Sequence, residues 1–137
     1  GDCVRAFRGH TRHVYRATFS PDTTQVLTAS GDGAAKIFDV GTGACIRSFG
    51  GHGPRVYTAV FSPDATKVLL ACEDSVARLF EASSGACEKE FHGHSMAVHS
   101  ASFSRDAKWV ITASDDLTAR LFDISTAACE RTFGGHG

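Results

Sequence analysis

The sequence predicts an all-β protein built from three copies of one four-stranded antiparallel unit. Three observations support this prediction. The dipeptide Gly-His recurs every 42 residues, at Gly9-His10, Gly51-His52, Gly93-His94 and Gly135-His136. Cysteine and phenylalanine keep the same period, at Cys3, Cys45, Cys87 and Cys129 and at Phe7, Phe49, Phe91 and Phe133. Short strand-like runs alternate with turn residues, and no segment shows a sustained helical period. A fixed period of this length is typical of solenoids, propellers and arrays.

The second copy shows the four expected strands in order. Residues 45–49 alternate between apolar and polar types and lie between glycines. Residues 56–61 are rich in β-branched and aromatic side chains and end at the turn 62–64. Residues 67–72 form a nearly continuous apolar run, as expected for a strand covered on both faces, and residues 76–80 alternate again. Each copy is therefore expected to be a meander that needs neighbours to cover its faces.

Composition disfavours several classes of protein. The chain has 137 residues, 42% of them hydrophobic, and a net charge of −1, which argues against a nucleic-acid binder because such a protein needs a basic patch. The longest apolar run, residues 68–72, is far shorter than the ~18 residues of a membrane span. No signal-peptide pattern opens the chain, and it begins with Gly1, as an excised piece would.

The five cysteines are predicted to be reduced and buried. Four occupy one repeat-equivalent position, so they lie on successive units, farther apart than the ~7 Å that a disulfide permits between Cα atoms. The fifth, Cys72, falls in an apolar run. Zinc-type spacing is missing, and no cofactor or metal is expected. Reduced thiols indicate an intracellular, cytoplasmic protein.

The chain resembles the WD-repeat β-propeller family over its whole length. In each copy an aromatic-acidic pair begins 28 residues after the histidine, at Phe38-Asp39, Phe80-Glu81 and Phe122-Asp123. The turn Phe-Ser-Pro-Asp at 19–22 recurs at 61–64, and as Phe-Ser-Arg-Asp at 103–106. The resemblance implies three propeller blades, residues 10–50, 52–92 and 94–134, with residues 1–8 as a surplus outer strand.

The resemblance also implies a buried polar network in each blade. Its expected members are His10, His52 and His94 with Asp32, Asp74 and Asp116. The hydroxyl is Thr28 or Ser30 in the first copy and Thr112 or Ser114 in the third, with Ser30 and Ser114 taken as members. Phenylalanine replaces the family's tryptophan and has no donor, so the networks should stop at the hydroxyl. The middle copy has Leu70 and Cys72 at these positions and should keep only His–Asp.

Chemical alternatives are weaker than this structural interpretation. The recurring Ser, His and Asp residues suggest a hydrolase, but a nucleophile needs an exposed Oγ beside an oxyanion hole. A hydrogen-bond network that holds the loops of each unit together explains why the set occurs in every copy. Residues 30–36 resemble a phosphate loop but lack its Gly-Lys-Ser/Thr ending and a following helix. No pair of histidines at helical spacing is available for a metal. The chain is therefore not expected to be an enzyme.

Positions that differ among the copies are candidates for partner binding. In propellers of this family, partners usually bind one rim near the central channel, at positions flanking the first strand's opening valine and just before the network aspartate. Carried over by resemblance, these positions are His13, Tyr15, Gly31, Arg55, Tyr57, Glu73, Ala97, His99 and Asp115. Tyrosine and arginine are typical interface anchors, although ordinary loop exposure explains the set equally well. The mixed charges do not indicate the sign of a partner.

Three blades cannot close a ring, because propellers have typically four to eight blades. Two chains would give six blades, within that range, and three would give nine, outside it. The sequence thus predicts a homodimer forming a six-bladed ring, with a trimer as the lesser possibility. The leading functional interpretation is a non-catalytic interaction scaffold that binds a protein or peptide on the ring face. The alternative is a self-assembling propeller fragment, natural or engineered, with no native partner.

Overall fold

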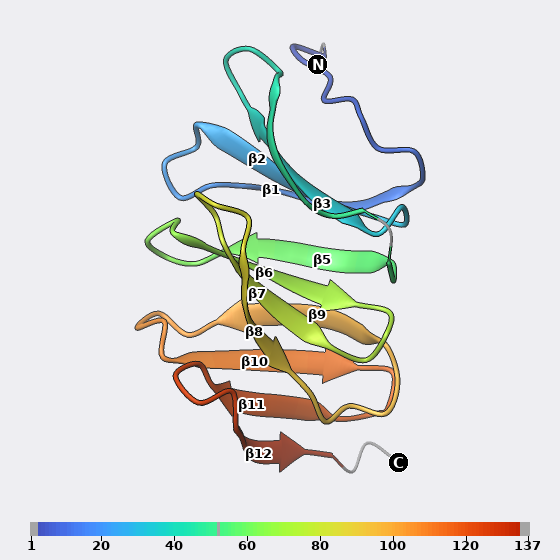
Figure 1. The fold of residues 1–137 in the computed structure, drawn as a ribbon, viewed down its shortest axis with the longest axis vertical. Helices are drawn as coiled ribbons and strands as arrows, with labels where there is room; N and C mark the ends of the chain where they lie inside the picture. The colour runs from blue at the N-terminus through green and yellow to red at the C-terminus, as the bar shows by residue number, and fades with distance from the viewer. Residues whose placement is uncertain (1–2, 52, 135–137) are drawn as a thin grey trace.

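The structure is a computed structural model that describes residues 3–51 and 53–134. In these residues the strands form three four-stranded antiparallel sheets, here called blades, stacked along the long axis (Figure 1). Blade one consists of β1 (Val14–Phe19), β2 (Gln25–Ser30), β3 (Ala34–Asp39) and β4 (Cys45–Gly50). Blade two consists of β5 (Val56–Phe61), β6 (Lys67–Cys72), β7 (Ala77–Glu81) and β8 (Cys87–Phe91). Blade three consists of β9 (Val98–Phe103), β10 (Trp109–Ser114), β11 (Ala119–Asp123) and β12 (Cys129–Phe133).

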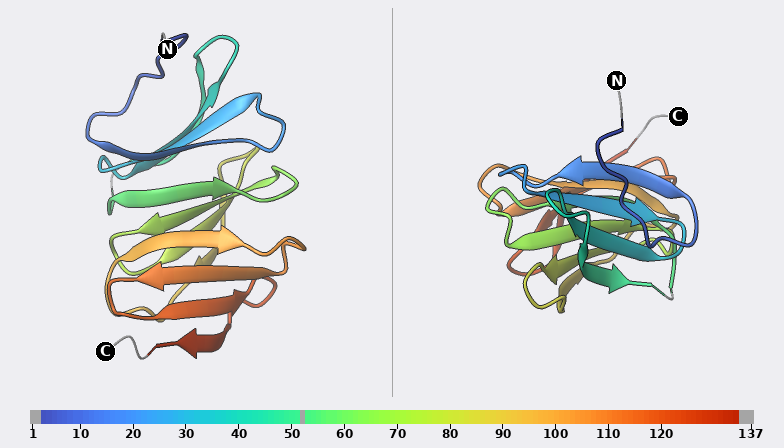
Figure 2. Two further views of the ribbon diagram at one scale, coloured as in Figure 1. Left: turned by 180° about the vertical axis from the view of Figure 1, so that it is seen from behind. Right: turned by 90° about the horizontal axis from the view of Figure 1, so that it is seen from above.

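Each blade is a meander whose strands pair in chain order. The all-β prediction with three four-stranded antiparallel units is confirmed. In the second copy, 56–61 and 67–72 are strands with the predicted bounds, and the strand predicted at 76–80 is β7, one residue further on. The blades follow one another in the stack, so that β1 and β12 belong to opposite ends of it (Figures 1 and 2).

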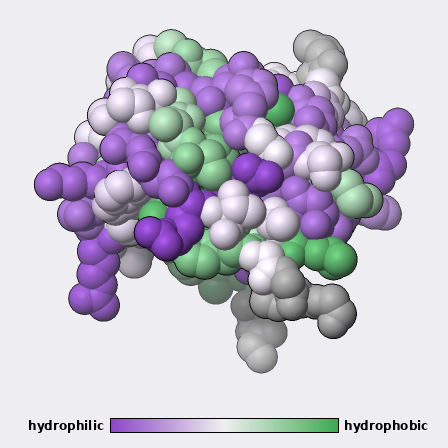
Figure 3. All heavy atoms as spheres, turned by 90° about the horizontal axis from the view of Figure 1, so that it is seen from below, coloured by the Kyte–Doolittle hydropathy of each residue, from purple (hydrophilic) through white to green (hydrophobic). Residues whose placement is uncertain are grey.

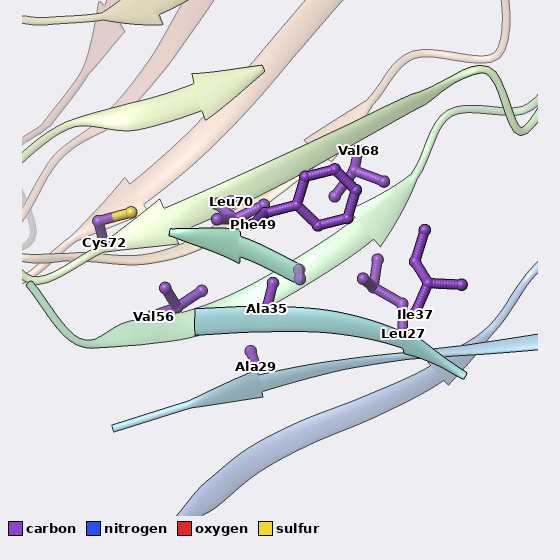
Figure 4. Packing of buried hydrophobic residues seen from close by; sticks show 10 residues of the cluster. Leu27, Ala29, Ala35, Ile37, Phe49, Val56, Val68, Leu70 and Cys72 are labelled. Carbon is purple, nitrogen blue, oxygen red and sulfur yellow. The ribbon is translucent and has the colours of Figure 1, made fainter. Parts of the chain in front are cut away.

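The hydrophobic core lies between the blades. Leu27, Ile37 and Phe49 of blade one pack against Val56 and Leu70 of blade two (Figure 4). The same arrangement recurs one repeat later, where the second cluster contains Leu69, Ala71, Ala77, Leu79, Phe91, Val98, Ala101, Val110 and Phe122. A sheet this small cannot cover both faces alone, so each blade depends on its neighbours for stability.

Blades one and two approach closely at Gly33. A Cβ atom there would lie 2.8 Å from the carbonyl oxygen of Gly53, and the residue has a φ of 84°. Both facts favour glycine, because a side chain would clash with backbone and the left-handed conformation is costly for other residues. At the equivalent position blade three has Leu117, with a φ of 69°.

The hairpin between the first two strands is closed by an aspartate in each blade. In blade one, Asp22 Oδ1 accepts hydrogen bonds from Ser20 Oγ (2.7 Å), Thr24 N (3.0 Å) and Thr24 Oγ1 (2.7 Å). Asp64 accepts the equivalent bonds from Ser62 and Thr66 at the same distances. These donors, Ser20 or Ser62 foremost, lower the pKa of each aspartate from 3.8 to about 2.

We therefore expect the free energy of unfolding to fall as the pH is lowered from about 4 towards 2. The unfolded chain takes up protons near pH 3.8, whereas these folded carboxylates resist protonation until about 2. The double variant Asp22→Asn/Asp64→Asn should flatten this slope in urea unfolding measured at several pH values. Glu130→Gln, on exposed β12, should keep the wild-type profile. An unchanged slope in the double variant would contradict the assignment.

The prediction of buried cysteines is correct only for Cys72. That residue is 2% exposed, whereas the four repeat-equivalent cysteines are exposed. Cys45, Cys87 and Cys129 open β4, β8 and β12, the outermost strands, which have no further strand beyond them to cover the thiol. Instead, each of these three thiols lies 3.7 Å from a carbonyl oxygen two residues further along its own strand, as in Cys45 to Arg47.

Residues 3–8, the described part of the predicted surplus strand, do not form a strand. Such a strand would pair with the third strand of a preceding blade, and none is present in the described chain. The segment nevertheless occupies the place of an outer strand. Phe7 packs on Phe38 with ring centroids 5.3 Å apart, as Phe49 packs on Phe80 (5.4 Å).

The two ends of the stack expose residues that are buried inside it. On blade one, Val14 is 51% exposed, whereas its equivalent Val56 is 1% exposed. On blade three, Ile111 is 42% exposed, whereas its equivalent Leu69 is fully buried. We call these surfaces the blade-one face, which includes Val14 and Phe19, and the blade-three face, which includes Ile111 and Phe133. Figure 3 shows apolar side chains exposed among hydrophilic ones at the blade-three end.

Candidate functional site

A bulge in the first strand of every blade positions one aromatic side chain at the rim. The register of β1 against β2 shifts between Val14 and Arg16, so Tyr15 is the extra residue. Tyr57 on β5 and His99 on β9 occupy the same place in shifts of the same kind. A bulge leaves its extra residue out of the backbone pairing between the strands and redirects its side chain. This explains why these three residues project in the same way.

The three rings form a continuous row, here called the aromatic ladder. The centroids of Tyr15 and Tyr57 are 5.3 Å apart, and those of Tyr57 and His99 are 4.7 Å apart. Tyr15 is 41% exposed and the His99 side chain 49% exposed, so the ladder faces solvent. Its members lie on the first strand of each blade. These strands, β1, β5 and β9, contact one another across the blade boundaries.

Charged groups flank the ladder. Glu73 lies 3.8 Å from Arg55 Nε and accepts a 3.5 Å hydrogen bond from the Tyr57 hydroxyl. Asp115 Oδ1 lies 2.6 Å from His99 Nε2. The pKa of Arg55 is raised above its usual value, first by Tyr15 and then by Glu73, so this side chain stays cationic.

The structure brings the remaining predicted rim residues to the same edge through backbone hydrogen bonds. The amide of Gly31 donates to the carbonyl of His13 (2.8 Å), and equivalent bonds join Glu73 to Arg55 (2.9 Å) and Asp115 to Ala97 (3.0 Å). Gly31 also lies under Tyr15, because a Cβ atom there would be 3.3 Å from the tyrosine hydroxyl. Arg12, beside this glycine, is a rim residue that the resemblance did not indicate.

The polar network is present in blades one and three. His10 Nδ1 is hydrogen-bonded to Asp32 Oδ2 (2.9 Å) and Nε2 to Thr28 Oγ1 (2.6 Å). In blade three, His94 makes the same contacts with Asp116 (2.8 Å) and Thr112 (2.6 Å). Burial alone would raise the pKa of Asp32, but hydrogen bonds from the Thr11 amide and from His10 outweigh it and lower the value to about 2.

The predicted serines hold the network loop rather than the histidine. Ser30 Oγ donates to the carbonyl of Arg12 (3.3 Å) and accepts from the amide of Asp32 (3.2 Å). Ser114 makes the equivalent bonds to Met96 (3.0 Å) and Asp116 (3.1 Å). Of the two hydroxyls that the sequence left open in each copy, Thr28 and Thr112 contact the histidine ring, whereas Ser30 and Ser114 join the network through its loop.

In the middle blade, the described contacts of Asp74 form an ion pair. His52 lies outside the described residues. Asp74 accepts two hydrogen bonds from Arg78, at 3.1 and 2.6 Å, and Arg78 Nε donates to Glu90 (2.9 Å). These bonds, the one to Asp74 foremost, raise the pKa of Arg78. Leu70, at the threonine position, is 2% exposed and belongs to the core.

This arrangement does not resemble a hydrolytic site. The His94 side chain is 1% exposed and both its ring nitrogens are bonded within the blade, so it cannot contact a substrate in solvent. Ser30 is fully buried. Across residues 3–51 and 53–134, no group of three or more His, Cys, Asp or Glu side chains is placed to hold a metal ion. The same residues include no helix with the length and apolarity needed to span a bilayer.

Four-stranded meanders that stack through their faces, each fastened by a His–Asp pair or an ion pair, define a β-propeller type of repeat protein. A family model for the WD domain, G-beta repeat (WD40), matches three times, at residues 1–39, 43–81 and 85–123. The chain belongs to this family. No curated protein sequence matches it.

Solved structures show the same fold. The chain is similar to a structure described as RRP9 WD40 repeats and to one described as U3-55K, each with a TM-score of 0.89 and 22% sequence identity. Each likeness covers 96% of this chain but only 42% of the solved chain, so the protein spans less than half the length of these structures.

Proposed function

We propose that the protein is a non-catalytic interaction scaffold that acts within an assembled ring and binds a protein or peptide at its channel-side rim. The aromatic ladder carries this proposal. Exposed tyrosines supply a large rigid contact area with a polar tip and are enriched at interfaces. Arg55, Glu73 and Asp115 surround them with hydrogen-bonding groups. The net charge of −1 supports a protein partner over nucleic acid or a membrane surface.

A second copy of the chain is the proposed occupant of both open faces. Every interface between blades pairs residues such as Leu69 with residues such as Val98, and the exposed Ile111 and Val14 are their equivalents. Packing the blade-three face of one copy on the blade-one face of another would repeat an interface the molecule already contains. Two copies would make six blades, within the usual range, whereas three would make nine.

The same faces favour one alternative function, a self-assembling structural module with no partner of its own. The invariant 42-residue spacing suits it, because equal units stack without adjustment. The two functions differ at the rim, since a pure module has no use for the ladder. For either function we place the protein in the cytoplasm, where its four exposed thiols would remain reduced.

Tyr57→Ala is expected to weaken the binding of rim ligands by about 30-fold, because central tyrosines at interfaces contribute about 2 kcal/mol or more. Ligands would be selected from a random peptide display library and measured by fluorescence anisotropy. Lys108→Ala, in the hairpin at the opposite end of the strands, should leave affinity unchanged. A library that yields no peptide sensitive to Tyr57 would refute the scaffold and favour the module.

A further inference from the structure

One pocket on the rim is lined by cationic and aromatic side chains. It has a volume of about 710 Å³ and lies where blades one and two meet. Its lining residues are His10, Thr11, Arg12, His13, Tyr15, Gly31 and Arg55. No carboxylate is among them, although the whole chain has 15 Asp and Glu residues against 14 Lys and Arg residues.

The polar groups of this pocket are available to a ligand. Arg12 and His13 are exposed, and no carboxylate in the described part of the chain lies within ion-pair distance of either. Arg55 is paired only with Glu73, at 3.8 Å, and both of these side chains are about half exposed. Such an exposed pair contributes little and can exchange partners readily.

The three copies differ at these positions. Arg12 and His13 correspond to Met96 and Ala97 in the third copy, which carry no charge. The third copy nevertheless forms a blade with the same strand order. Arg12 and His13 are therefore not needed to build a blade, and a role in binding accounts for their placement at this junction.

We propose that this pocket recognises carboxylate side chains of an acidic peptide segment. Arginine forms paired hydrogen bonds with a carboxylate, so Arg12 and Arg55 would bind successive acidic residues. The rings of Tyr15 and Tyr57 would pack against the methylene groups between them. The inference rests on the proposed scaffold function and specifies the chemistry of its partner.

A fluorescein-labelled hexaglutamate peptide tests the proposal against a hexaglutamine peptide of the same length. The full chain should bind hexaglutamate at least tenfold more tightly in an anisotropy titration, and higher sodium chloride should weaken that binding. Arg12→Ala and Arg55→Ala should each weaken it about tenfold, and Arg12→Lys should retain part of it. Arg105→Ala, an exposed arginine at the other end of the strands, should have no effect. Circular dichroism confirms folding of each variant.

Equal binding of the two peptides, or equal losses in Arg105→Ala and Arg12→Ala, would overturn carboxylate recognition. That failure can be distinguished from failure of the scaffold itself. Peptides selected from the random library that depend on Tyr57 but not on Arg12 would preserve the rim as a binding face while rejecting the acidic partner. A phosphoserine peptide that binds more than tenfold tighter than its glutamate counterpart would also overturn the assignment.

Discussion

Ile111→Glu and Phe19→Glu should each convert the two-chain ring that we propose into single chains. Each places a carboxylate on an open face that would be buried against a second copy, and burying an unpaired charge costs several kcal/mol. We expect the dissociation constant to rise at least 100-fold, which corresponds to about 3 kcal/mol. Sedimentation equilibrium measures the assembly mass. Both residues are exposed in the single chain, so folding should be retained.

Mixing the two variants tests the head-to-tail geometry. In a mixed pair, one junction carries both substitutions and the other carries neither, so association should partly recover. Ile46→Glu is the matched control, because Ile46 is exposed on outer strand β4 and its equivalents are Glu88 and Glu130. A wild-type chain that stays a single species of one-chain mass at micromolar concentration would refute the homodimer. A nine-blade mass would indicate the trimer instead.

His94→Ala should lower the free energy of unfolding by about 3 kcal/mol. The substitution removes the hydrogen bonds that join the buried ring to Asp116 and Thr112, together with its 3.2 Å contact to the Thr118 hydroxyl, and leaves the Asp116 side chain, which is 7% exposed, with its bonds from Ser95 and Thr118 alone. Removing one member of a buried pair typically costs about 3–5 kcal/mol, and the remaining bonds from Ser95 and Thr118 keep the loss near the lower bound.

Urea unfolding at fixed protein concentration measures this loss, since association would also affect apparent stability. His92→Ala is the control. His92 lies two residues away, its side chain is 64% exposed and its contact is a 3.3 Å approach to Glu90. A loss below about 1 kcal/mol for His94→Ala would show that the pair does not fasten the blade.

Strand positions were predictable because they depend on local patterns. Residues 67–72 read as a strand covered on both faces, and β6 is buried along almost its whole length. The cysteines were misjudged because alternation shows which residues share a face of a strand but not whether another element covers that face. The hydroxyl partner of His10 stayed open between Thr28 and Ser30 because both lie on the same face of β2, and only the position of the His10 ring distinguishes them.

Contacts between blades could not be predicted from one repeat. The predicted rim contained Tyr15, Tyr57 and His99 as separate candidates, but their stacking depends on the spacing of neighbouring bulges. Arg78 was unpredictable in another way. Its equivalents, Lys36 and Arg120, are also cations, and only the second copy combines such a cation with both Asp74 and Glu90 in reach.

The contact of Phe7 with Phe38 affects how fast two chains can join. In a closed pair, Phe133 of one chain would pack on Phe38 of the other chain. In the single chain, Phe7 already packs on that Phe38 ring. Association of the two chains then requires Phe133 to displace Phe7 from Phe38. The enthalpy change at this contact should be small, because one phenylalanine replaces another. Its rate would follow the release of residues 3–8, so dilution and reconcentration should show slow exchange of subunits rather than immediate re-equilibration.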